Sequence, residues 1–373
     1  MRSEAAVVPD FGKGKVFAAM SGGVDSSVAA LLLQRQGYEV VGVTFKLFDN
    51  EEIGQDAERA CCSFDSIERA RAVCNQLGIT HYVMSMVSEF AEAVIDRFVC
   101  EYAAGRTPNP CVLCNRHIKF EAFLRKARAI GADFVATGHH ARVQRSEAGW
   151  RLLPAKDQDK DQSYALAHLN QSTMPYVLFP VGEYLKTEVR DLAREAGLPT
   201  AETPESQDIC FVPEGTYQEF LAGRNVPSAP GPIMDTEGDI LGVHAGLHHY
   251  TVGQRKNLGL SAGERLYVIE KRIGDNALVV GPEEQVRREM VQVEDLNWCD
   301  LPAGEWPDCP GDYSLEAMLR YRQKPIPCSI VWHNPDERTL ELELDEPGIA
   351  APGQTVALYD AHDGHVVAGG TIK

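Results

Sequence analysis

The sequence has no long hydrophobic run and no excess of positive charge. No apolar stretch approaches the roughly 20 residues that a membrane-spanning helix needs. The N-terminal segment MRSEAAVVPDFGKGK also lacks the long apolar stretch of a secretory signal peptide. We therefore expect a cytoplasmic protein that does not bind membranes, with residues 1–14 forming a flexible arm.

The chain contains 36 Lys and Arg residues against 54 Asp and Glu residues, which gives a net charge of −18. Nucleic acids bind proteins chiefly through neutralisation of their phosphates, so an acidic chain repels RNA on average. A nucleic-acid ligand would therefore need a local basic surface. Two segments contain cations, histidines and aromatic residues but no acidic residue, namely Met318–His333 and His248–Leu260. Such segments are typical of nucleic-acid contacts.

No internal repeat or low-complexity tract is present, and the first half of the chain alternates short apolar runs with helical periodicity. Strands are expected at Lys15–Met20, Val40–Phe45, His81–Met86 and Phe134–Thr137. Helices are expected at Ser26–Gln36, Ser66–Leu77 and Asn115–Ile130, the last with Ile118, Phe120, Phe123, Leu124 and Ala127 on its buried side. This alternation predicts a doubly wound parallel sheet in a domain at residues 15–212.

The composition changes near Val212, where proline, glycine and other turn residues become frequent. We expect a small central domain at residues 213–288. Short β segments then follow at Ser329–His333, Leu340–Leu344, Thr355–Tyr359 and Val366–Gly370. They predict a C-terminal antiparallel β-barrel at residues 289–373, which would carry the basic segment at 318–333. The predicted fold class is α/β, with a parallel N-terminal sheet followed by these two smaller domains.

Ten cysteines in a chain without an export signal favour catalysis, redox chemistry or metal binding over a disulfide scaffold. Five stand alone and are expected to be small buried hydrophobic residues: Cys74, Cys100, Cys299, Cys309 and Cys328. Adjacent cysteines rarely chelate one ion well, so Cys61 and Cys62 are expected to be structural or incidental. The remaining three cysteines are the candidates for chemistry: Cys111, Cys114 and Cys210.

The segment SGGVDSS (Ser21–Ser27) lies between the first expected strand and the first expected helix. Its glycines let the backbone curve around an anion, while its hydroxyls and the helix N-terminus favour negative charge. The lysine of the Walker motif is absent, and the spacing is not that of a dinucleotide-binding loop. The segment therefore predicts a phosphate-binding loop of another class, placed where open α/β sheets bind ligands.

Two of the candidate cysteines lie in GRTPNPCVLCNRHIKF (Gly105–Phe120), which contains cations but no acidic residue. We expect Cys114 to precede a helix whose N-cap is Asn115. A thiol at a helix N-terminus beside cations should have a lowered pKa. The third candidate, Cys210, lies far away in the segment PESQDICFVPEG.

The SGGVDSS segment resembles the signature of the PP-loop ATP pyrophosphatases, and the chain as a whole resembles the tRNA-specific 2-thiouridylase family. The resemblance extends over nearly the whole sequence. Its motifs are SGGVDSS at 21–27, GRTPNP at 105–110, LCNRHIKF at 113–120, ATGHH at 136–140, KDQSY at 160–164, LFPVGE at 178–183, ICF at 209–211, HHYTVGQRKNLGL at 248–260, RYRQKPIPC at 320–328 and APGQ at 351–354. Several of these are specific to this family rather than to PP-loop enzymes in general.

The resemblance implies an enzyme that adenylates O2 of a tRNA uridine with ATP and Mg²⁺ and then replaces this oxygen with sulfur. The expected substrate is uridine 34 of the tRNAs for Lys, Glu and Gln. The implied ATP contacts are Ala19, Met20, Ser21, Gly22, Gly23, Val24, Asp25, Ser26, Phe45 and Gly138. Asp25 would organise the Mg²⁺–pyrophosphate end of the nucleotide.

The same resemblance implies contacts with the target base from Asn109, Pro110 and Cys111. It implies tRNA contacts from His139, Lys160, Asp161, Gln162, Arg320, Tyr321 and Gln354. Cys114 and Cys210 would be the catalytic thiols: a persulfide on Cys210 delivers sulfur, and Cys114 releases it by forming a disulfide. The sulfur would come from a persulfide donor protein, such as a cysteine desulfurase or a sulfur-relay protein.

The chain departs from the commonest family pattern at Cys111, where many members carry an aspartate that assists the catalytic cysteine. Three interpretations remain open. Cys111 and Cys114 form a redox pair, or Cys111 is a benign substitution, or these two and Cys210 hold a [4Fe-4S] cluster with one open iron. Two other functions also remain: a PP-loop ligase for a small metabolite, and a non-catalytic regulator that binds RNA or nucleotides.

Overall fold

The computed structural model of the protein describes residues 14–48, 64–204, 209–212, 216–224, 226, 228–260, 265–301, 306–307 and 313–373. The N-terminal part contains a five-stranded sheet of order β3-β2-β1-β4-β7, in which every pairing is parallel. Its strands are β1 (Lys15–Ala19), β2 (Glu39–Lys46), β3 (Thr80–Ser85), β4 (Phe134–Ala136) and β7 (Val177–Leu178). The four strands expected from the sequence are confirmed, whereas the two-residue β7 was not expected.

Helices cover both faces of this sheet, as the alternation of side chains along β1 requires. Val16 and Ala18 pack with α1 (Val24–Arg35), α3 (Phe64–Leu77) and α8 (Lys186–Glu195). Phe17 points to the other face, where two long helices pack. One is formed by α4 (Val87–Phe90), η1 (Ala91–Asp96) and α5 (Arg97–Ala103), and the other by α6 (Pro110–Leu113), η2 (Cys114–Ala122) and α7 (Phe123–Ala129). The doubly wound arrangement is confirmed, and so is the predicted buried side of the second long helix.

The central part is a small sheet of order β10-β11-β8-β9 with its own core around Ile233, Val268 and Leu278. Its strands are β8 (Gly231–Met234), β9 (Ile240–His244), β10 (Tyr267–Arg272) and β11 (Ala277–Gly281), preceded by α9 (Tyr217–Gly223). Short helical turns occur at η3 (Gln158–Lys160), η4 (Ser163–Leu166), η5 (Met174–Tyr176), η6 (Pro180–Glu183), η7 (Leu247–His249) and α10 (Glu283–Val286).

The C-terminal part is the predicted antiparallel barrel. Its strands are β12 (Arg288–Trp298), β13 (Leu315–Met318), β14 (Ile326–Asn334), β15 (Thr339–Gly348), β16 (Thr355–Asp360) and β17 (Val366–Ile372). They follow the order β12-β15-β14-β13-β16-β17, and the additional pairing of β12 with β17 closes the ring. An unexpected hairpin, β5 (Ala141–Ser146) and β6 (Gly149–Pro154), extends the barrel sheet by pairing Leu152 with Val366.

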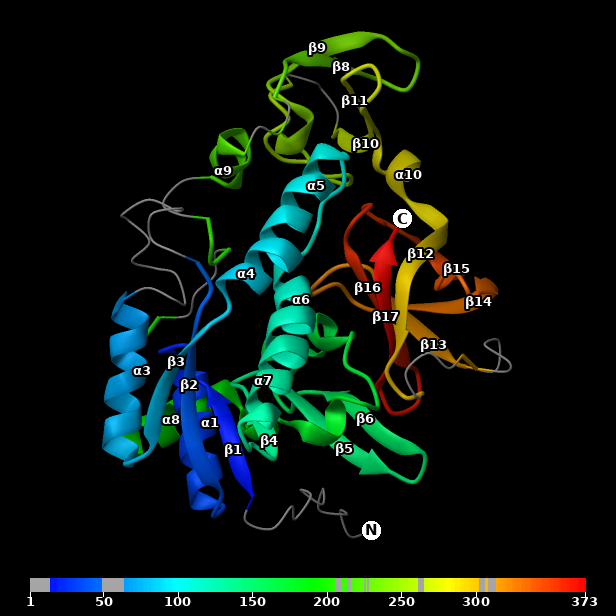
Figure 1. Ribbon diagram of the computed structural model, residues 1–373. Coiled ribbons are helices and arrows are strands. Elements are labelled where there is room, and N and C mark those ends of the chain that lie inside the picture. The colour runs from blue at the N-terminus through cyan, green and yellow to red at the C-terminus, as the bar shows by residue number, and fades with distance from the viewer. Residues whose placement is uncertain are drawn as a thin grey trace.

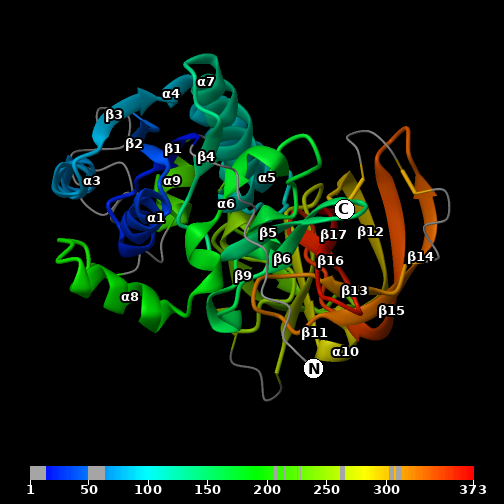
Figure 2. The same ribbon diagram turned by 90° about the horizontal axis from the view of Figure 1, so that it is seen from below.

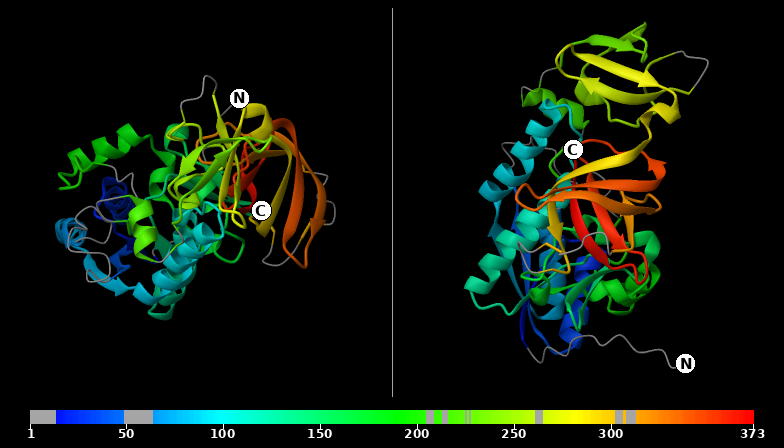
Figure 3. Two further views of the ribbon diagram at one scale, coloured as in Figure 1. Left: turned by 90° about the horizontal axis from the view of Figure 1, so that it is seen from above. Right: turned by 90° about the vertical axis from the view of Figure 1, so that its right-hand side faces the viewer.

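The barrel packs against the N-terminal part. Figure 1 shows the parallel sheet at the lower left, the barrel at the right and the central sheet at the top, with the two long helices between them. The view from below in Figure 2 again shows the parallel sheet at the left and the barrel at the right, and the side view at the right of Figure 3 shows the central sheet above the barrel. One hydrophobic core joins the parallel sheet and the barrel, because Phe17 and Val41 of the sheet belong to the same cluster as Tyr359 and Val366 of the barrel. The barrel is therefore in direct contact with the N-terminal domain and can influence the position of its residues.

The cysteine predictions have mixed outcomes. Cys74, Cys299 and Cys328 are buried, as expected, and burial raises the pKa of Cys74 to about 11. Cys100 is exposed on α5, so its prediction was wrong. The predictions for Cys61, Cys62 and Cys309 and for the N-terminal arm lie outside the described residues. Among the helices that the structure describes, none combines the length and hydropathy needed to cross a bilayer.

Candidate functional site

A cavity of about 320 Å³ opens at the carboxyl ends of β1, β2 and β4, a size within the usual range for small-molecule sites. Predicted ATP contacts line it: Ala19, Met20, Ser21, Asp25, Ser26, Phe45 and Gly138. The two expected catalytic cysteines and several residues expected to contact the target base or the tRNA also line the cavity: Pro110, Cys111, Cys114, His139, Gln162 and Cys210. Segments far apart in the sequence therefore meet at one cavity.

The phosphate loop has the predicted strand–loop–helix geometry. Gly22 has a φ of 73°, and a Cβ there would lie 2.5 Å from the backbone oxygen of Ser66, so only glycine fits. Ser26 Oγ and Ser27 Oγ donate to Gly23 O at 3.0 and 2.9 Å and hold the first turn of α1. A Cβ on Gly138 would lie 2.5 Å from the backbone nitrogen of Ser26, so the turn after β4 packs directly on the loop. Gly22 and Gly23 shape the loop without lining the cavity.

Asp25 is held by two basic side chains that the sequence analysis missed. Lys186 Nζ donates to its two carboxylate oxygens at 2.7 and 2.6 Å, and His140 Nε2 lies 3.1 Å from Oδ1. Burial alone would raise the pKa of Asp25, but His140 and Lys186 together bring that pKa below its usual value. Asp25 is thus an ionised, half-buried carboxylate whose negative charge is balanced by Lys186. The sequence signals were the second histidine of ATGHH and the lysine three residues after LFPVGE.

The helix that carries Cys111 and Cys114 begins earlier than expected. Asn109 is its N-cap, with Oδ1 accepting from the backbone nitrogens of Cys111 at 3.2 Å and of Val112 at 3.4 Å. The prediction that Asn115 is the N-cap was wrong, since Asn115 lies inside the helix and donates to the backbone oxygen of Ala165 at 2.9 Å. The thiol in the first turn of this helix is therefore that of Cys111 rather than that of Cys114.

The two cysteines lie three residues apart, so they share one face of this helix. Cys111 is exposed and Cys114 is buried, with 8% of its surface accessible. Lys119, one turn further along, also lines the cavity. Its Nζ donates to Asn115 Oδ1 at 2.8 Å and approaches His139 Nε2 at 3.4 Å. The thiols therefore face a cavity that contains a lysine.

Cys210 reaches the cavity because its neighbour Phe211 is anchored in the core. The Phe211 side chain is 1% exposed, and its ring packs edge-on against Phe90, Phe98 and Phe220 with centroids 5.3–5.7 Å apart. This anchor fixes the short described segment Ile209–Val212 beside the ends of the strands. Cys210 is half-buried and lines the same cavity as Cys111 and Cys114.

His139 lies inside the site rather than on an outer surface. It is buried between Phe120 and Phe179, and its Nδ1 lies 2.6 Å from Thr137 Oγ1. Burial and the charge of Lys119 hold the pKa of His139 well below its usual value. The imidazole is therefore neutral at physiological pH.

The other residues expected to contact tRNA are spread over two regions. Gln162 lines the cavity and accepts from the backbone nitrogen of His140 at 2.8 Å. Neighbouring Asp161 is partly buried, and burial raises its pKa although it accepts from Ser163 Oγ at 2.6 Å. Lys160, in η3, is half-buried outside the cavity lining.

Of the three residues of the barrel, Tyr321 and Gln354 hydrogen-bond with the N-terminal domain. Arg320 and Tyr321 are exposed just after β13, and the Tyr321 hydroxyl donates to the backbone oxygen of Asp161 at 3.3 Å. Gln354 Nε2 donates to the backbone oxygen of Thr107 at 2.6 Å. The structure thus places Gln354 against Thr107, which lies just before the helix that carries Cys111 and Cys114 (the cysteine helix).

Two arginines of the segment Gly105–Phe120, which contains no acidic residue, are paired with carboxylates from elsewhere in the chain. Arg106 binds Glu101 and Glu294, each at 2.6 Å, and Arg116 binds Asp295 at 2.5 Å. Both guanidinium groups are therefore engaged in ion pairs within the protein. Their partners Glu294 and Asp295 come from β12 of the barrel.

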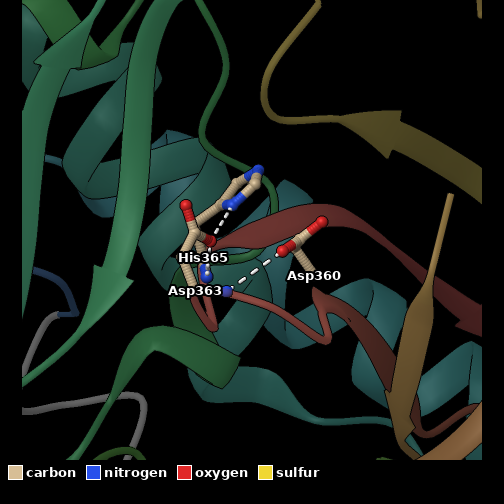
Figure 4. Close-up of side chains that lie close together, drawn as sticks. All are labelled: Asp360, Asp363 and His365. Carbon is tan, nitrogen blue, oxygen red and sulfur yellow. Dashed lines mark hydrogen bonds and ion pairs between the residues drawn. The ribbon is translucent and has the colours of Figure 1, made fainter.

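A separate cluster of two aspartates and one histidine lies in the turn between β16 and β17 (Figure 4). Within it, His365 Nδ1 is hydrogen-bonded to Asp363, and Asp360 Oδ1 accepts from the backbone nitrogens of His362 and Asp363. Asp363 also pairs with Arg151 of β6 at 2.7 Å. The carboxylates are thus occupied in closing a turn and joining the hairpin to the barrel.

This cluster predicts a pH dependence of stability. The buried His365 also has Nε2 3.6 Å from Asp300 Oδ2. Burial lowers the pKa of His365, but Asp300 and Asp363 outweigh this effect and raise the pKa above its ordinary value. Protonated His365 therefore stabilises the fold fully below about pH 6.5, and this stabilisation is lost as the pH rises through the raised pKa.

Urea unfolding of the wild type and of His365→Gln between pH 5.5 and 8.5 checks this expectation. At the acidic end the wild type should be more stable than His365→Gln by ~1 kcal/mol in free energy of unfolding. This difference between the two proteins should shrink with rising pH. A difference that stays constant or grows with pH would contradict it.

Comparisons with known proteins agree along the whole chain. Family models match residues 14–214 (tRNA methyl transferase HUP domain), 218–282 (tRNA methyl transferase PRC-barrel domain) and 288–372 (aminomethyltransferase beta-barrel domain). The tRNA-specific 2-thiouridylase MnmA of Halothermothrix orenii is 44% identical over 361 residues, covering 96% of this chain and 98% of that protein. The chain belongs to the tRNA-specific 2-thiouridylase family.

A second family member, from Clostridioides difficile, is 42% identical over 96% of this chain and 97% of its own length. Among solved structures, a 4-thiouridine synthetase–RNA complex with bound ATP has a TM-score of 0.34 and 19% identity, covering 58% of this chain and 51% of that one. Two of the three family models are named after methyl transfer and the third after aminomethyl transfer, whereas the full-length relatives are named after thiolation.

Proposed function

We propose that this chain is a tRNA uridine 2-sulfurtransferase that adenylates O2 of a uridine with ATP and then exchanges the activated oxygen for sulfur. The observation that carries this proposal is the shared cavity. Ser21 and Asp25 of the phosphate loop line it together with Cys114 and Cys210, which come from two distant segments. Full-length relatives described as tRNA-specific 2-thiouridylases support the choice of substrate.

In the first step, O2 of the uridine attacks the α-phosphorus of ATP, and pyrophosphate leaves. The loop Ser21–Ser26 would receive the phosphates at the N-terminus of α1. Asp25, which lines the cavity as an ionised carboxylate, is a suitable ligand for the Mg²⁺ that accompanies the nucleotide. Phe45 and Gly138, from neighbouring strand ends, also line the cavity.

In the second step, the outer sulfur of a persulfide on Cys210 attacks C2, and AMP leaves with its electron pair on the former O2. The Cys114 thiolate then attacks the inner sulfur of Cys210. The bond between the two persulfide sulfurs breaks, 2-thiouridine is released, and a Cys114–Cys210 disulfide forms. A thiol reductant supplies two electrons to reset the enzyme, and a persulfide donor protein reloads Cys210. The target base must leave its stack to enter the cavity.

The presence of Cys111 keeps a second sulfur route open. Cys111, Cys114 and Cys210 all line the cavity, so three thiolates are available to a [4Fe-4S] cluster with one open iron. Anaerobic purification with iron and sulfide analysis separates the routes. Iron-free protein that thiolates tRNA at full rate with a persulfide donor would exclude the cluster.

Pyrophosphate release tests the proposed function. Release from ATP should depend on unmodified tRNA, because the uridine oxygen is the acceptor of AMP. Release that depends on a small metabolite would favour a PP-loop ligase, and no release with any acceptor would favour a non-catalytic regulator. We also propose that the protein works in the cytoplasm, where tRNA and ATP are available.

Arg320→Ala should weaken tRNA binding without changing ATP binding. Arg320 is exposed and lies in an acid-free segment, so its loss removes about one phosphate contact. We expect a roughly 3- to 10-fold higher Kd for tRNA and a salt dependence that is shallower by about one unit.

Filter binding at several salt concentrations measures the effect of Arg320→Ala. Arg194→Ala is the matched control, because Arg194 is also exposed but pairs with Asp191 of α8 and with Glu202. An equal loss of tRNA and ATP binding in Arg320→Ala would contradict the assignment.

A further inference from the structure

The segment that carries Cys111 and Cys114 is attached to the barrel on both sides of the two cysteines. Arg106 lies five residues before Cys111, and Arg116 lies two residues after Cys114. Arg106 Nη2 binds Glu294 Oε1 at 2.6 Å, and Arg116 Nη1 binds Asp295 Oδ2 at 2.5 Å. Two consecutive acidic residues of β12 therefore bracket the segment that carries both thiols.

The backbone of β12 is shaped to present these two carboxylates. The pairing of β12 with β17 changes register between Glu294 and Asn297, and Asp295 has a φ of 51°, a left-handed conformation that is uncommon outside glycine but that aspartate adopts more readily than most residues. A bulge of this kind redirects side chains out of a regular ladder. Asn297 then donates to the backbone oxygen of Leu169 at 3.0 Å, which fixes the strand beyond the bulge against the N-terminal domain.

The electrostatics make the Asp295 contact the stronger of the two. Asp295 is also 3.4 Å from Arg338 Nη1 and 4.0 Å from Arg97 Nη2, so three guanidinium groups surround one carboxylate. The side chains of Asp295 and Arg116 are 25% and 17% exposed, so bulk water screens this pair only partly. Burial raises the pKa of Asp295, but Arg116, together with neighbouring groups that include Arg338, more than offsets this effect, and the pKa is lowered overall.

A loop of the barrel adds a third attachment on the approach to the helix. Thr107 donates its backbone N–H to Pro352 O at 2.8 Å and accepts from Gln354 Nε2 at 2.6 Å. A Cβ on Gly353 would lie 2.8 Å from the Thr107 nitrogen, so the loop is in close contact with the backbone there. The segment between Thr107 and Arg116 is thus anchored to the barrel at its start and at its end.

We propose that Glu294 and Asp295 are positioning residues through which the barrel fixes Cys111 and Cys114 at the cavity. Neither carboxylate is among the residues that line the cavity, so they act through Arg106 and Arg116. The sulfur chemistry needs Cys114 placed to within a fraction of an ångström of its partner atoms, and small displacements of such groups cost up to about 100-fold in rate. The role in sulfur transfer rests on the proposed function, whereas the fixing of the thiols does not.

Asp295→Asn tests this inference, because it removes the charge and keeps the shape. We expect a 10- to 100-fold slower single-turnover thiolation at saturating ATP and tRNA, with the Kd for tRNA within about 3-fold of the wild-type value. Alkylation of Cys114 by iodoacetamide, followed by site-resolved mass spectrometry without tRNA, should become at least about 5-fold faster, since a loosened helix exposes this buried thiol.

Asp363→Asn is the matched control. It breaks another pair between the barrel and the N-terminal domain, Arg151–Asp363 at 2.7 Å, which does not involve the cysteine segment. Unchanged Cys114 alkylation in Asp295→Asn, or equal acceleration in Asp363→Asn, would overturn the inference. Alkylation decides the matter even if the wild type does not thiolate tRNA, and Glu294→Gln provides a second, milder variant if Asp295→Asn does not fold.

Discussion

Cys210→Ser is expected to reduce 2-thiouridine formation by about 10³-fold or more, while tRNA-dependent release of pyrophosphate from ATP continues. The reason is that adenylation uses the phosphate loop, whereas Cys210 acts only after AMP has been attached. Serine nearly preserves the size of the side chain but cannot carry a persulfide. The anchor of this segment, Phe211, is unchanged, so the fold around the cavity should be retained.

Parallel measurements of pyrophosphate and of 2-thiouridine over one time course check this uncoupling. Cys100→Ser is the matched control, because Cys100 is exposed on α5 and does not line the cavity. It should behave like the wild type in both measurements. Thiolation by Cys210→Ser at more than a tenth of the wild-type rate would show that sulfur does not pass through Cys210.

Lys186→Met is expected to destabilise the fold by about 2–3 kcal/mol. The substitution leaves the Asp25 carboxylate without its closest cation in a pocket where Lys186 is 8% exposed. Loss of one partner of a fully buried pair costs about 3–5 kcal/mol, and the 29% exposure of the Asp25 side chain reduces this cost. The lower stability should appear as a lower midpoint of urea unfolding at pH 7.

Two further variants make this prediction specific to the ion pair. Lys186→Arg keeps the charge and should lose less stability than Lys186→Met. In Asp25→Asn/Lys186→Met no unpaired charge is left, so part of the loss should be recovered. Equal destabilisation by Lys186→Met and by the double variant would mean that packing of the lysine stem, and not its charge, stabilises the pocket.

The fold was largely predictable because its signals are local. The apolar runs of β1, β2 and β4 and the loop Ser21–Ser27 follow one another closely in the sequence, and their parallel arrangement follows from the helices between them. The hairpin β5–β6 was missed because its strands are polar on one side and complete a sheet formed by residues more than 200 positions away. The start of the cysteine helix was misplaced although Asn109–Pro110 carries the standard signal of a capping residue followed by proline.

The site was predictable only in part because its electrostatics are long-range. The sequence alone indicated that the loop Ser21–Ser27 and the CVLC segment carry chemistry, and the resemblance to a family gave Cys210 its expected role. No local pattern, however, connects Asp25 with Lys186, which is 161 residues away, or Arg116 with Asp295, which is 179 residues away. The first pair depends on how α1 and α8 pack within the N-terminal domain, and the second depends on how the barrel docks against that domain.

Nucleoside mass spectrometry of tRNA is the most direct test of the central claim. Unmodified tRNA would be incubated with the enzyme, ATP, Mg²⁺ and a persulfide donor, then digested to nucleosides and compared with reactions that lack ATP or contain Cys210→Ser. We predict 2-thiouridine in the complete reaction and almost none in the other two. Absence of 2-thiouridine from the complete reaction, or its equal formation without ATP, would contradict it.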